Sequence, residues 1–506
     1  MGAGALSMDQ PFDLLIVGGG INGVGIARDA AGRGLKVLLV EQDDLASHTS
    51  SASTKLIHGG LRYLEHYEFR LVRESLIERE RLMRIAPHII RPLEFVLPHH
   101  RGSRPAWMVR LGLFLYDHLG GRDALPGSAS VALRGTARGA GLKPEIAKGF
   151  TYSDCRVDDA RLVVLNAIDA RERGADIRTR TRFVEAARDG DVWIATLADS
   201  ETGARSVARA QHIVNVAGPW VDKVLGSVAG AAAERAPRLV KGSHIVVPRM
   251  FPGEHAFILQ NADKRIVFAI PYEGDFTLVG TTDIAVGSAD AARIDDDEIA
   301  YLCTSVNDWF ATPITPADIV WSYAGVRPLY DDGSDSASAV TRDYVMKLGT
   351  GEGPQLLSIF GGKLTTYRKL AEHALEKLEP FVTMTRGPWT DCEPLPGGDM
   401  ADGDFAAFMR AVRARWPFLP AALAERMGRA YGTRIADLLG EARSLADLGA
   451  DLGGGLHERE VSYLVEQEYA RTADDILWRR SKLGLNLSAD AARRLTEYLA
   501  REKAHV

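Results

Sequence analysis

The sequence predicts a mixed α/β protein built in three parts, on the strength of three observations. A glycine-rich turn joins an apolar strand, Phe12–Val17, to a helix near the N-terminus. Residues 238–282 form short apolar runs separated by Pro and Gly, which is typical of an antiparallel sheet. After a loop rich in Gly and Asp, residues 404–506 carry an almost continuous helical pattern. The length of 506 residues also favours about three domains.

The composition excludes several classes of protein. Hydrophobic residues make up 46% and charged residues 25%, so the chain can bury a sizeable core. The net charge of −6 offers no broad basic surface for nucleic acid. Cys155, Cys303 and Cys392 form no CxxC pair, which fits a reducing compartment. The first ten residues lack the features of a signal peptide, and no apolar run reaches about 18 residues. We therefore expect a cytoplasmic protein that is soluble or lies on a membrane surface.

Residues 12–41 alternate in the manner of a βαβ unit. The strand Phe12–Val17 is followed by a predicted helix over residues 22–31 and a second strand over residues 36–41. The turn between the first strand and the helix has the pattern G-x-G-x-x-G, and the second strand ends on Glu41. A glycine-rich turn alone is weak, but here every part falls at the required spacing. The segment therefore predicts a Rossmann-type dinucleotide-binding domain.

Each residue of this fingerprint has a physical role. Gly18 permits the tight turn, Gly20 lets the backbone approach a pyrophosphate, and Gly23 allows close packing of helix on strand. The pyrophosphate then meets the free N–H groups at the N-terminus of the helix. Glu41 is expected to accept hydrogen bonds from the ribose hydroxyls. The fingerprint does not by itself distinguish FAD from NAD.

Two later segments favour FAD. Residues 212–220 (HIVNVAGPW) resemble the strand end that passes near the cofactor in two-domain flavoproteins. Residues 360–370 (FGGKLTTYRKL) place two glycines before a predicted helix, which supplies a second helix N-terminus for an anion or a ring oxygen. An extended FAD needs a site spread over the whole chain, and these segments provide one.

Other elements are predicted from periodicity. Residues 68–86 have apolar positions at helical spacing among dense charge, which predicts a long exposed helix. Residues 160–220 are interpreted as a helix, several short strands and a hairpin at residues 188–191. Residues 295–310 predict an amphipathic helix with an acidic start. We interpret that start as carboxylates favoured at a helix N-terminus rather than as a metal cluster.

Six further segments carry long motifs: SSASTKLIHGGLRYLEHYEFRLVRE (50–74), KGSHIVVP (241–248), GTTD (280–283), GVRPL (325–329), TRDY (341–344) and GGKLTTYRKLAEHALEKL (361–378). Together they resemble the FAD-dependent, aerobic glycerol-3-phosphate dehydrogenases, collinearly over roughly residues 12–500. The resemblance implies oxidation of sn-glycerol 3-phosphate to dihydroxyacetone phosphate, with electrons passed from FADH2 to a membrane quinone. It also implies a D-amino-acid-oxidase-like fold with an added C-terminal helical domain.

We divide the chain accordingly into three domains. The FAD-binding domain is discontinuous and comprises residues 10–90, 150–235 and 345–380. The substrate or cap domain, with its antiparallel sheet, comprises residues 91–149 and 236–344. The all-helical domain comprises residues 395–506. The sequence does not determine the oligomeric state, and a homodimer is left open.

Oxidising a secondary alcohol requires a hydride acceptor, a base for the hydroxyl proton and a clamp for the phosphate. His58, in the turn LIHGGLRY, is the candidate base, because an imidazole titrates near the working pH. Arg327 precedes Pro328 in a stiff turn and is assigned to the substrate oxygens near the flavin. The rest of the cationic and hydroxyl pool is assigned to substrate binding, mainly to the phosphate: Arg62, Tyr63, Arg342 and Lys363.

The residues expected to contact FAD lie in the fingerprint and in the motifs just described. They are Gly18, Gly20, Gly23, Glu41, Ser50, Ser51, Gly60, Ala217, Gly218, Trp220, Gly361, Gly362, Lys363, Leu364 and Thr365.

Three other functions share features with this sequence. A glycerol-3-phosphate oxidase, which returns the electrons to oxygen, has nearly the same sequence around the flavin. A non-catalytic flavin-binding scaffold has no use for His58 together with a phosphate clamp. An amino-acid oxidase of the same fold needs fewer cations, because one carboxylate needs one guanidinium fork.

Membrane contact is a separate hypothesis. Residues 99–122 mix basic and aromatic side chains, which suits a helix lying in the membrane interface. An ordinary helix packed on the core is an equally good interpretation. His99 and His100 have no Cys or carboxylate partner at ligand spacing, so no metal site is expected. We expect a peripheral protein on the inner face of the cytoplasmic membrane.

Overall fold

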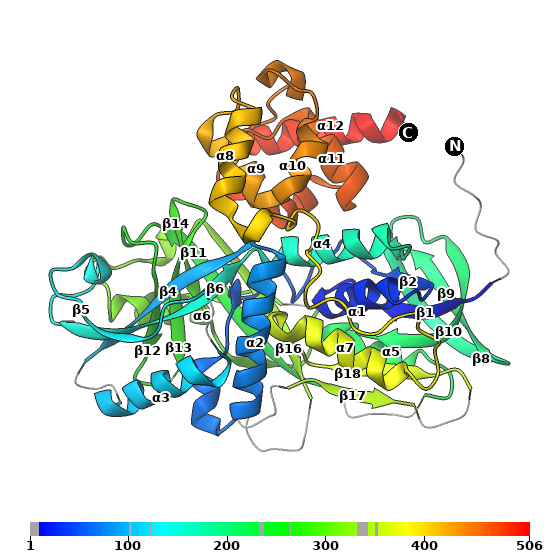
Figure 1. Cartoon of the computed structure of the whole chain (residues 1–506), viewed down its shortest axis with the longest axis horizontal. Helices are drawn as coiled ribbons and strands as arrows, with labels where there is room; N and C mark the ends of the chain where they lie inside the picture. Colours follow the sequence, from blue (N-terminus) through cyan, green and yellow to red (C-terminus); the bar gives the residue numbers. More distant parts are fainter. Residues whose placement is uncertain are drawn as a thin grey trace.

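The computed structural model describes residues 10–100, 104–121, 124–231, 237–263, 265–290, 292–330, 343–349 and 353–505. Figure 1 shows two sheets side by side, with the C-terminal helices (orange to red) standing over them. The predicted combination of an α/β domain, an antiparallel sheet and a helical tail is confirmed. Within the described residues no helix has the length and apolar character needed to span a bilayer.

The first sheet is built around the predicted βαβ unit. β1 (Phe12–Val17) pairs in parallel with β2 (Val37–Val40) and with β10 (Arg205–Asn215). β2 is wholly buried, which is usual for a parallel strand covered on both faces. The strand order is β17-β18-β10-β1-β2-β7, and the hairpin of β8 and β9 is attached to β10. The other strands are β7 (Asp176–Arg178), β8 (Thr181–Asp189), β9 (Val192–Asp199), β17 (Val345–Leu348) and β18 (Leu356–Phe360).

Three helices cover this sheet and enclose its main core. The helix of the fingerprint, α1 (Ile21–Gly32), packs between α4 (Asp159–Glu172) and α7 (Tyr367–Leu378). Apolar residues of the three helices and of β1 and β2 form one buried cluster. α5 (Val221–Gly226) follows β10.

The second sheet is mostly antiparallel, in the order β15-β11-β14-β13-β12-β4-β6-β3, with β16 on β11 and β5 on β6. The apolar runs predicted over residues 238–282 correspond to β11 to β14. The predicted domain boundary at residue 150 falls inside β6. This strand pairs with β4 along ten residues, so all of it belongs to the second sheet. The strands are β3 (Leu56–Ile57), β4 (Ile90–His99), β5 (Ala129–Ala132), β6 (Lys148–Val157), β11 (Arg238–Pro248), β12 (Ala256–Gln260), β13 (Ile266–Tyr272), β14 (Phe276–Gly280), β15 (Ile284–Val286) and β16 (Trp321–Leu329).

The long charged helix is α2 (Phe69–Ile85), and the prediction that it is exposed is wrong for one of its faces. Glu78 and Arg79 are only 1% and 2% exposed. Each has a buried partner of opposite charge, since Glu78 pairs with Arg368 at 2.6 Å and Arg79 with Asp154 at 2.8 Å. Dense charge therefore marks buried ion pairs here as well as a solvated face.

Two shorter helices flank the second sheet, α3 (Ala106–Leu119) and α6 (Asp296–Asn307). The acidic start of α6 is a capping box: Asp295 accepts a hydrogen bond from the Glu298 N–H, and Glu298 accepts one from the Asp295 N–H. The interpretation of these carboxylates as helix N-terminal groups is thus confirmed.

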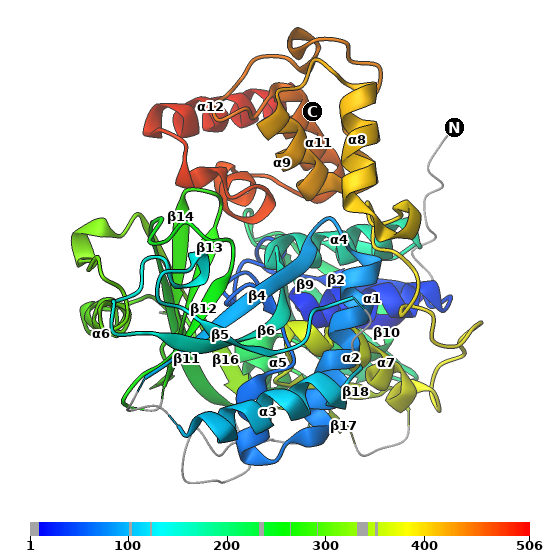
Figure 2. The ribbon, with the colours of Figure 1, turned by 60° about the vertical axis from the view of Figure 1, so that its left-hand side comes forward.

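The C-terminal domain has its own buried core and lies above α4 (Figure 2). Ion pairs join it to α4 and to the loops that follow β2 and β7. Arg480 donates to Asp44 at 2.7 Å, Arg180 pairs with Asp475 at 2.9 Å, and Arg161 pairs with Glu468. Its α-helices are α8 (Phe405–Arg415), α9 (Ala421–Tyr431), α10 (Ile435–Leu439), α11 (Glu458–Glu468) and α12 (Ala489–His505).

Candidate active site

A pocket opens at the carboxyl ends of β1 and β2, where the fingerprint lies. This is the edge of a parallel sheet at which dinucleotides bind. Segments far apart in the sequence meet there: the turn after β1, the end of β2, the loop at residues 46–50, the end of β10 and the turn after β18. Among the residues predicted to bind FAD, those lining the pocket are Gly18, Gly20, Glu41, Ser50, Ala217, Gly218, Trp220, Gly361, Gly362 and Leu364.

Two of the three fingerprint glycines, Gly18 and Gly23, leave no room for a side chain. Gly18 has a φ of +118°, and a Cβ there would lie 2.7 Å from the Val216 carbonyl oxygen. A Cβ on Gly23 would overlap the Gly18 carbonyl. Gly20 precedes the first turn of α1, and Ser50 Oγ accepts a hydrogen bond from the next N–H, that of Ile21, at 3.0 Å. Bare backbone at the N-terminus of a 12-residue helix is suited to a pyrophosphate.

A second glycine turn faces the first. Gly361 and Gly362 have φ values of +80° and +102°, conformations that L side chains rarely adopt. They precede the short 3₁₀ helix η5 (Leu364–Thr366), which runs into α7. The Asn22 side chain, on α1, donates to the Gly361 carbonyl at 3.1 Å and joins the two turns.

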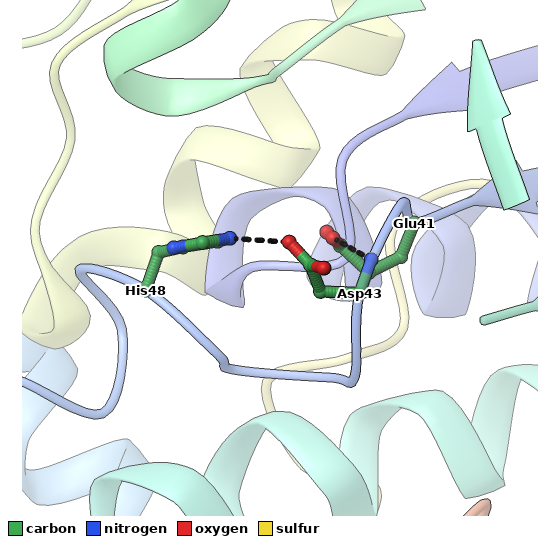
Figure 3. A group of neighbouring side chains, drawn as sticks. All are labelled: Glu41, Asp43 and His48. Carbon is green, nitrogen blue, oxygen red and sulfur yellow. Dashed lines mark hydrogen bonds and ion pairs between the residues drawn. The ribbon is translucent and has the colours of Figure 1, made fainter. Parts of the chain in front are cut away.

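Glu41 is buried at the end of the pocket, close to Asp43 and His48 (Figure 3). Its oxygens accept the N–H groups of Gly19 at 2.7 Å and of Asp43 at 2.9 Å. Burial raises the pKa of Glu41, and these two hydrogen bonds oppose the shift. Ligand atoms of the three residues lie within 4.8 Å of one another. The cluster is explained without an ion, because Asp43 is bonded to His48 at 2.9 Å and Glu41 to the backbone.

His58 lies between β3 and the 3₁₀ helix η1 (Leu61–His66), in a turn tied to the second glycine turn. The backbone N–H of His58 donates to Thr365 Oγ1 at 3.2 Å, and the Thr365 hydroxyl is 3.3 Å from the backbone carbonyl of His58. Burial lowers the pKa of His58; the charge of Asp154 opposes the shift, while Lys363 and Arg79 add to it. The imidazole therefore stays neutral, and able to accept a proton, below the pH at which a free histidine becomes charged.

Lys363 places a positive charge beside the turn that carries His58. Its Nζ is buried and has no hydrogen-bond partner among the described residues. The ammonium lies 4.0 Å from the centre of the Tyr63 ring, on η1. A buried cation without an anion is costly, so this position fits an anionic or strongly polar ligand. Lys363, Thr365 and Gly60 do not line the nucleotide pocket itself, but they belong to the two turns beside it.

Arg327 was predicted to lie in a stiff turn, and this is wrong: it lies within β16, opposite Val240 of β11. Its Nη2 is 3.2 Å from the Thr282 carbonyl and 3.2 Å from Asp283 Oδ1. Gly242 on the neighbouring strand leaves space for the guanidinium, since a Cβ there would lie 2.9 Å from Nη2. The antiparallel pairing of β16, rather than a turn, therefore orients the side chain.

Other predicted residues are not brought to this place. Arg62 lines a different cavity, of about 1160 Å³, together with His99 and Lys148. Ser51 makes a local turn through its hydroxyl to the His48 carbonyl at 3.3 Å. Gly23 does not line the pocket but packs against the Gly18 carbonyl, where it allows the close approach of helix and strand. Arg342 lies outside the described residues.

One histidine close to Arg327 was missed. His244 on β11 is 2% exposed, its Nε2 is 3.0 Å from Thr54 Oγ1, and its ring stacks on Tyr323 at 4.8 Å. Burial, Lys55 and Arg327 hold the pKa of His244 well below its usual value. The available signal was a lone histidine inside the otherwise apolar strand of the motif KGSHIVVP.

The role of the first glycine turn can be tested at Gly20. Gly20→Val puts a branched side chain where the backbone must approach a pyrophosphate, and its Cβ would lie 3.1 Å from Ser50 Oγ. The purified variant is expected to lose FAD, measured as the ratio of flavin to protein absorbance. Gly287→Val, at a glycine whose added Cβ meets nothing within 4 Å, is the control. Normal flavin content in Gly20→Val would contradict the assignment of the turn.

Comparisons with known proteins agree with this architecture. The family model "FAD dependent oxidoreductase" matches residues 13–368, and "C-terminal domain of alpha-glycerophosphate oxidase" matches residues 389–504. Glycerol-3-phosphate dehydrogenase of Pseudomonas aeruginosa is 56% identical, over 98% of this chain and 96% of that protein. Aerobic glycerol-3-phosphate dehydrogenase of Escherichia coli is 52% identical, over 96% and 97%. D-erythritol 1-phosphate dehydrogenase of Brucella abortus is 54% identical, over 95% and 96%.

A solved structure shows the same fold. The glycerol-3-phosphate dehydrogenase of Bacillus halodurans, complexed with FAD, superposes with a TM-score of 0.77 at 28% identity, over 99% of this chain and 92% of that one. With a nucleotide pocket built from both glycine turns, and relatives above half identity along nearly its whole length, the chain belongs to the FAD-dependent glycerol-3-phosphate dehydrogenase family.

Proposed function

We propose that the protein oxidises sn-glycerol 3-phosphate to dihydroxyacetone phosphate, with FAD as hydride acceptor and a membrane quinone as the next acceptor. The observation that carries the proposal is the buried Lys363 ammonium, which lies next to the turn of His58 and has no hydrogen-bond partner among the described residues. A substrate that carries both a phosphate and an oxidisable hydroxyl supplies an anion for the lysine and a proton for the histidine. The names of the relatives above half identity support the same substrate class.

The residues present fit FAD. A Cβ at Gly18, Gly23 or Gly362 would lie too close to neighbouring atoms, so both turns require glycine there, and the α1 N-terminus faces the pocket. When bound, FAD supplies the acceptor for the hydride that leaves the substrate carbon. The chain itself would hold the cofactor through these turns and through the buried carboxylate of Glu41.

The proton and the charges are handled by side chains of the chain. The neutral imidazole of His58 accepts the proton of the substrate hydroxyl, which leaves a ketone once the hydride has departed. The guanidinium of Arg327 stabilises the negative charge that develops on that oxygen. Lys363 binds the phosphate, with Tyr63 beneath its ammonium. His244 is the second candidate for the base, because it is buried, neutral and close to Arg327.

A membrane surface is the proposed partner of α3. Its side chains Trp107, Met108, Leu111 and Phe114 are 66%, 45%, 51% and 52% exposed. On its other face Leu113 and Tyr116 are buried against the sheet. One helix therefore combines a packed side with an apolar side that has no cover among the described residues, which suits a helix in the membrane interface. We infer a peripheral location on the inner face of the cytoplasmic membrane.

A longer polyol phosphate is the second candidate substrate, since the 54% identical relative is named D-erythritol 1-phosphate dehydrogenase. The relatives above half identity are named dehydrogenases, which favours a quinone over oxygen as the electron acceptor.

The proposed reaction is tested by the flavin spectrum under anaerobic conditions. Glycerol 3-phosphate is expected to bleach the flavin band without added NAD, and a soluble quinone analogue to restore it. D-Erythritol 1-phosphate and glycerol, compared at equal concentrations, report on chain length and on the need for the phosphate. Bleaching by D-erythritol 1-phosphate but not by glycerol 3-phosphate would make the longer polyol phosphate the substrate. Rapid reoxidation by oxygen but not by the quinone would identify an oxidase.

The division of labour between His58 and Arg327 gives a second test. His58→Asn is expected to bind glycerol 3-phosphate almost normally and to reduce its flavin roughly 10²- to 10⁴-fold more slowly in stopped-flow measurements. Because burial lowers the pKa of His58, the wild-type reduction rate is expected to fall only at a pH below the range in which a free histidine titrates. This decrease at low pH should be absent in the variant. Arg327→Lys keeps the charge but loses the bidentate geometry of the guanidinium. Both the affinity for glycerol 3-phosphate and the rate of flavin reduction should therefore decrease.

His244→Asn is the matched comparison for the base. A wild-type rate in His58→Asn together with a slow His244→Asn would move the base to His244. An effect of Arg327→Lys on the dissociation constant alone would place Arg327 in the phosphate clamp.

Membrane contact is tested by changing Trp107, Leu111 and Phe114 to Ser. The triple variant is expected to lose binding to vesicles that contain anionic lipid, measured by sedimentation, because its exposed apolar area is removed. Flavin reduction by substrate should be retained. Serine at the exposed apolar residues Val207, Val320 and Phe381, which lie on other parts of the surface, is the control. Unchanged vesicle binding of the α3 variant would assign the membrane face to another segment.

A further inference from the structure

The turn that carries His58 is held by a second contact, one that the reaction does not explain. The Gly59 N–H donates to the hydroxyl of Tyr116 on α3 at 2.8 Å. The Tyr116 hydroxyl in turn donates to the carboxylate of Asp154, whose oxygens are both 2.8 Å away. Arg79 Nη1 donates to the same carboxylate at 2.8 Å. Tyr116, Asp154 and Arg79 are 3%, 1% and 2% exposed.

We propose that Tyr116 is a positioning residue for the proposed base: its hydroxyl holds the backbone after His58 and the Asp154 carboxylate in one arrangement, and so sets where the imidazole lies and which charge it faces. This inference rests on the proposed function of His58. Tyr116 acts through the turn, because its hydroxyl is used by Gly59 and Asp154.

The geometry leaves the turn little freedom. A Cβ on Gly59 would lie 2.6 Å from the Tyr116 hydroxyl and 2.5 Å from Leu76 Cδ2. On the other side of the turn, Thr365 bonds both the N–H and the carbonyl of His58. His58 is thus fixed between a hydroxyl from η5 and a hydroxyl from α3. Without the Thr365 hydroxyl the backbone N–H of His58 loses this acceptor, and without the Tyr116 hydroxyl the Gly59 N–H keeps only its longer contact of 3.4 Å with Asp154 Oδ1. Either change weakens the hydrogen bonding of a buried turn.

The electrostatic setting depends on the same hydroxyl. The charged or titratable groups that face His58 are Asp154 on β6, Arg79 on α2, Lys363 before η5 and Tyr116 on α3. The negative charge of Asp154 raises the pKa of His58, whereas burial and the two cations lower it. The Tyr116 hydroxyl donates a hydrogen bond to this carboxylate and so offsets part of its negative charge. Without the hydroxyl, more of it acts on the imidazole.

The test is Tyr116→Phe in the flavin-loaded protein. The variant keeps the ring and its edge contact with Tyr152, whose centre is 5.8 Å away, and loses only the hydroxyl. We expect the rate of flavin reduction at saturating glycerol 3-phosphate to fall about 3- to 10-fold, the loss that one ordinary hydrogen bond implies. The dissociation constant of the substrate should be unchanged. The apparent pKa of the rate profile should rise, because the charge of Asp154 is no longer offset by the hydroxyl and acts more strongly on His58.

Tyr272→Phe is the matched control. Tyr272 lies in the same hydrophobic cluster as Tyr116, and its hydroxyl is buried without a hydrogen-bond partner among the described residues. Its removal should leave both the rate and the pH profile unchanged. Flavin content and the thermal unfolding midpoint are measured for both variants, and they separate a positioning role from a merely structural one.

The outcomes distinguish this inference from the proposed function. A slow His58→Asn with a wild-type rate and pH profile in Tyr116→Phe would overturn the positioning role and leave the base in place. Lower stability or flavin content in Tyr116→Phe, with an unchanged pH profile for the loaded fraction, would also overturn it. A wild-type rate in His58→Asn would remove the base assignment, and the role of Tyr116 would fall with it. A shifted profile in Tyr116→Phe alone, with Tyr272→Phe normal, supports the proposal.

Discussion

The hydroxyl of Thr365 joins two turns whose residues lie 307 positions apart in the chain, and the candidate site depends on that link. On one side is the turn of His58, which leaves the second sheet at β3. On the other is the glycine turn after β18, in the first sheet. Since the nucleotide pocket belongs to the first sheet and Arg327 to the second, the proposed base has to be held at the seam between them. Backbone hydrogen bonds to one side chain achieve this without a covalent link.

Buried ion pairs hold the helices and domains around the site in place. Arg368 with Glu78, Arg79 with Asp154 and Arg480 with Asp44 each join elements from different parts of the chain. Such pairs contribute less to net stability than their number suggests, because both charges lose their hydration. Breaking one of them is costly, however, so they favour a single arrangement of the domains. Lys363 differs from these pairs, because its buried ammonium has no hydrogen-bond partner among the described residues, and such a cation indicates a place for a ligand.

α3 connects the surface to the interior. Its exposed face presents Trp107, Leu111 and Phe114, whereas its buried face places Tyr116 against Gly59 and Asp154. The interpretation as a helix packed on the core holds for the buried face, and the proposed membrane contact would use the opposite face. A helix of 14 residues has enough turns to present two distinct faces.

What the sequence determined by itself was local. The fingerprint glycines, the antiparallel run over residues 238–282 and the helical tail were predictable, because spacing along the chain decides turns, strands and helices. The family motifs likewise pointed to FAD and to a phosphorylated alcohol. The tertiary structure decided the contacts between distant segments: the pairing of β6 with β4, the buried charges of α2, the place of Arg327 within a strand and that of Arg62 in another cavity. Tyr116 belongs to this second group, since only the packing of α3 brings its hydroxyl to a glycine 57 positions earlier in the sequence. Such contacts are set by the burial of whole faces and the pairing of whole strands, and no short segment records them.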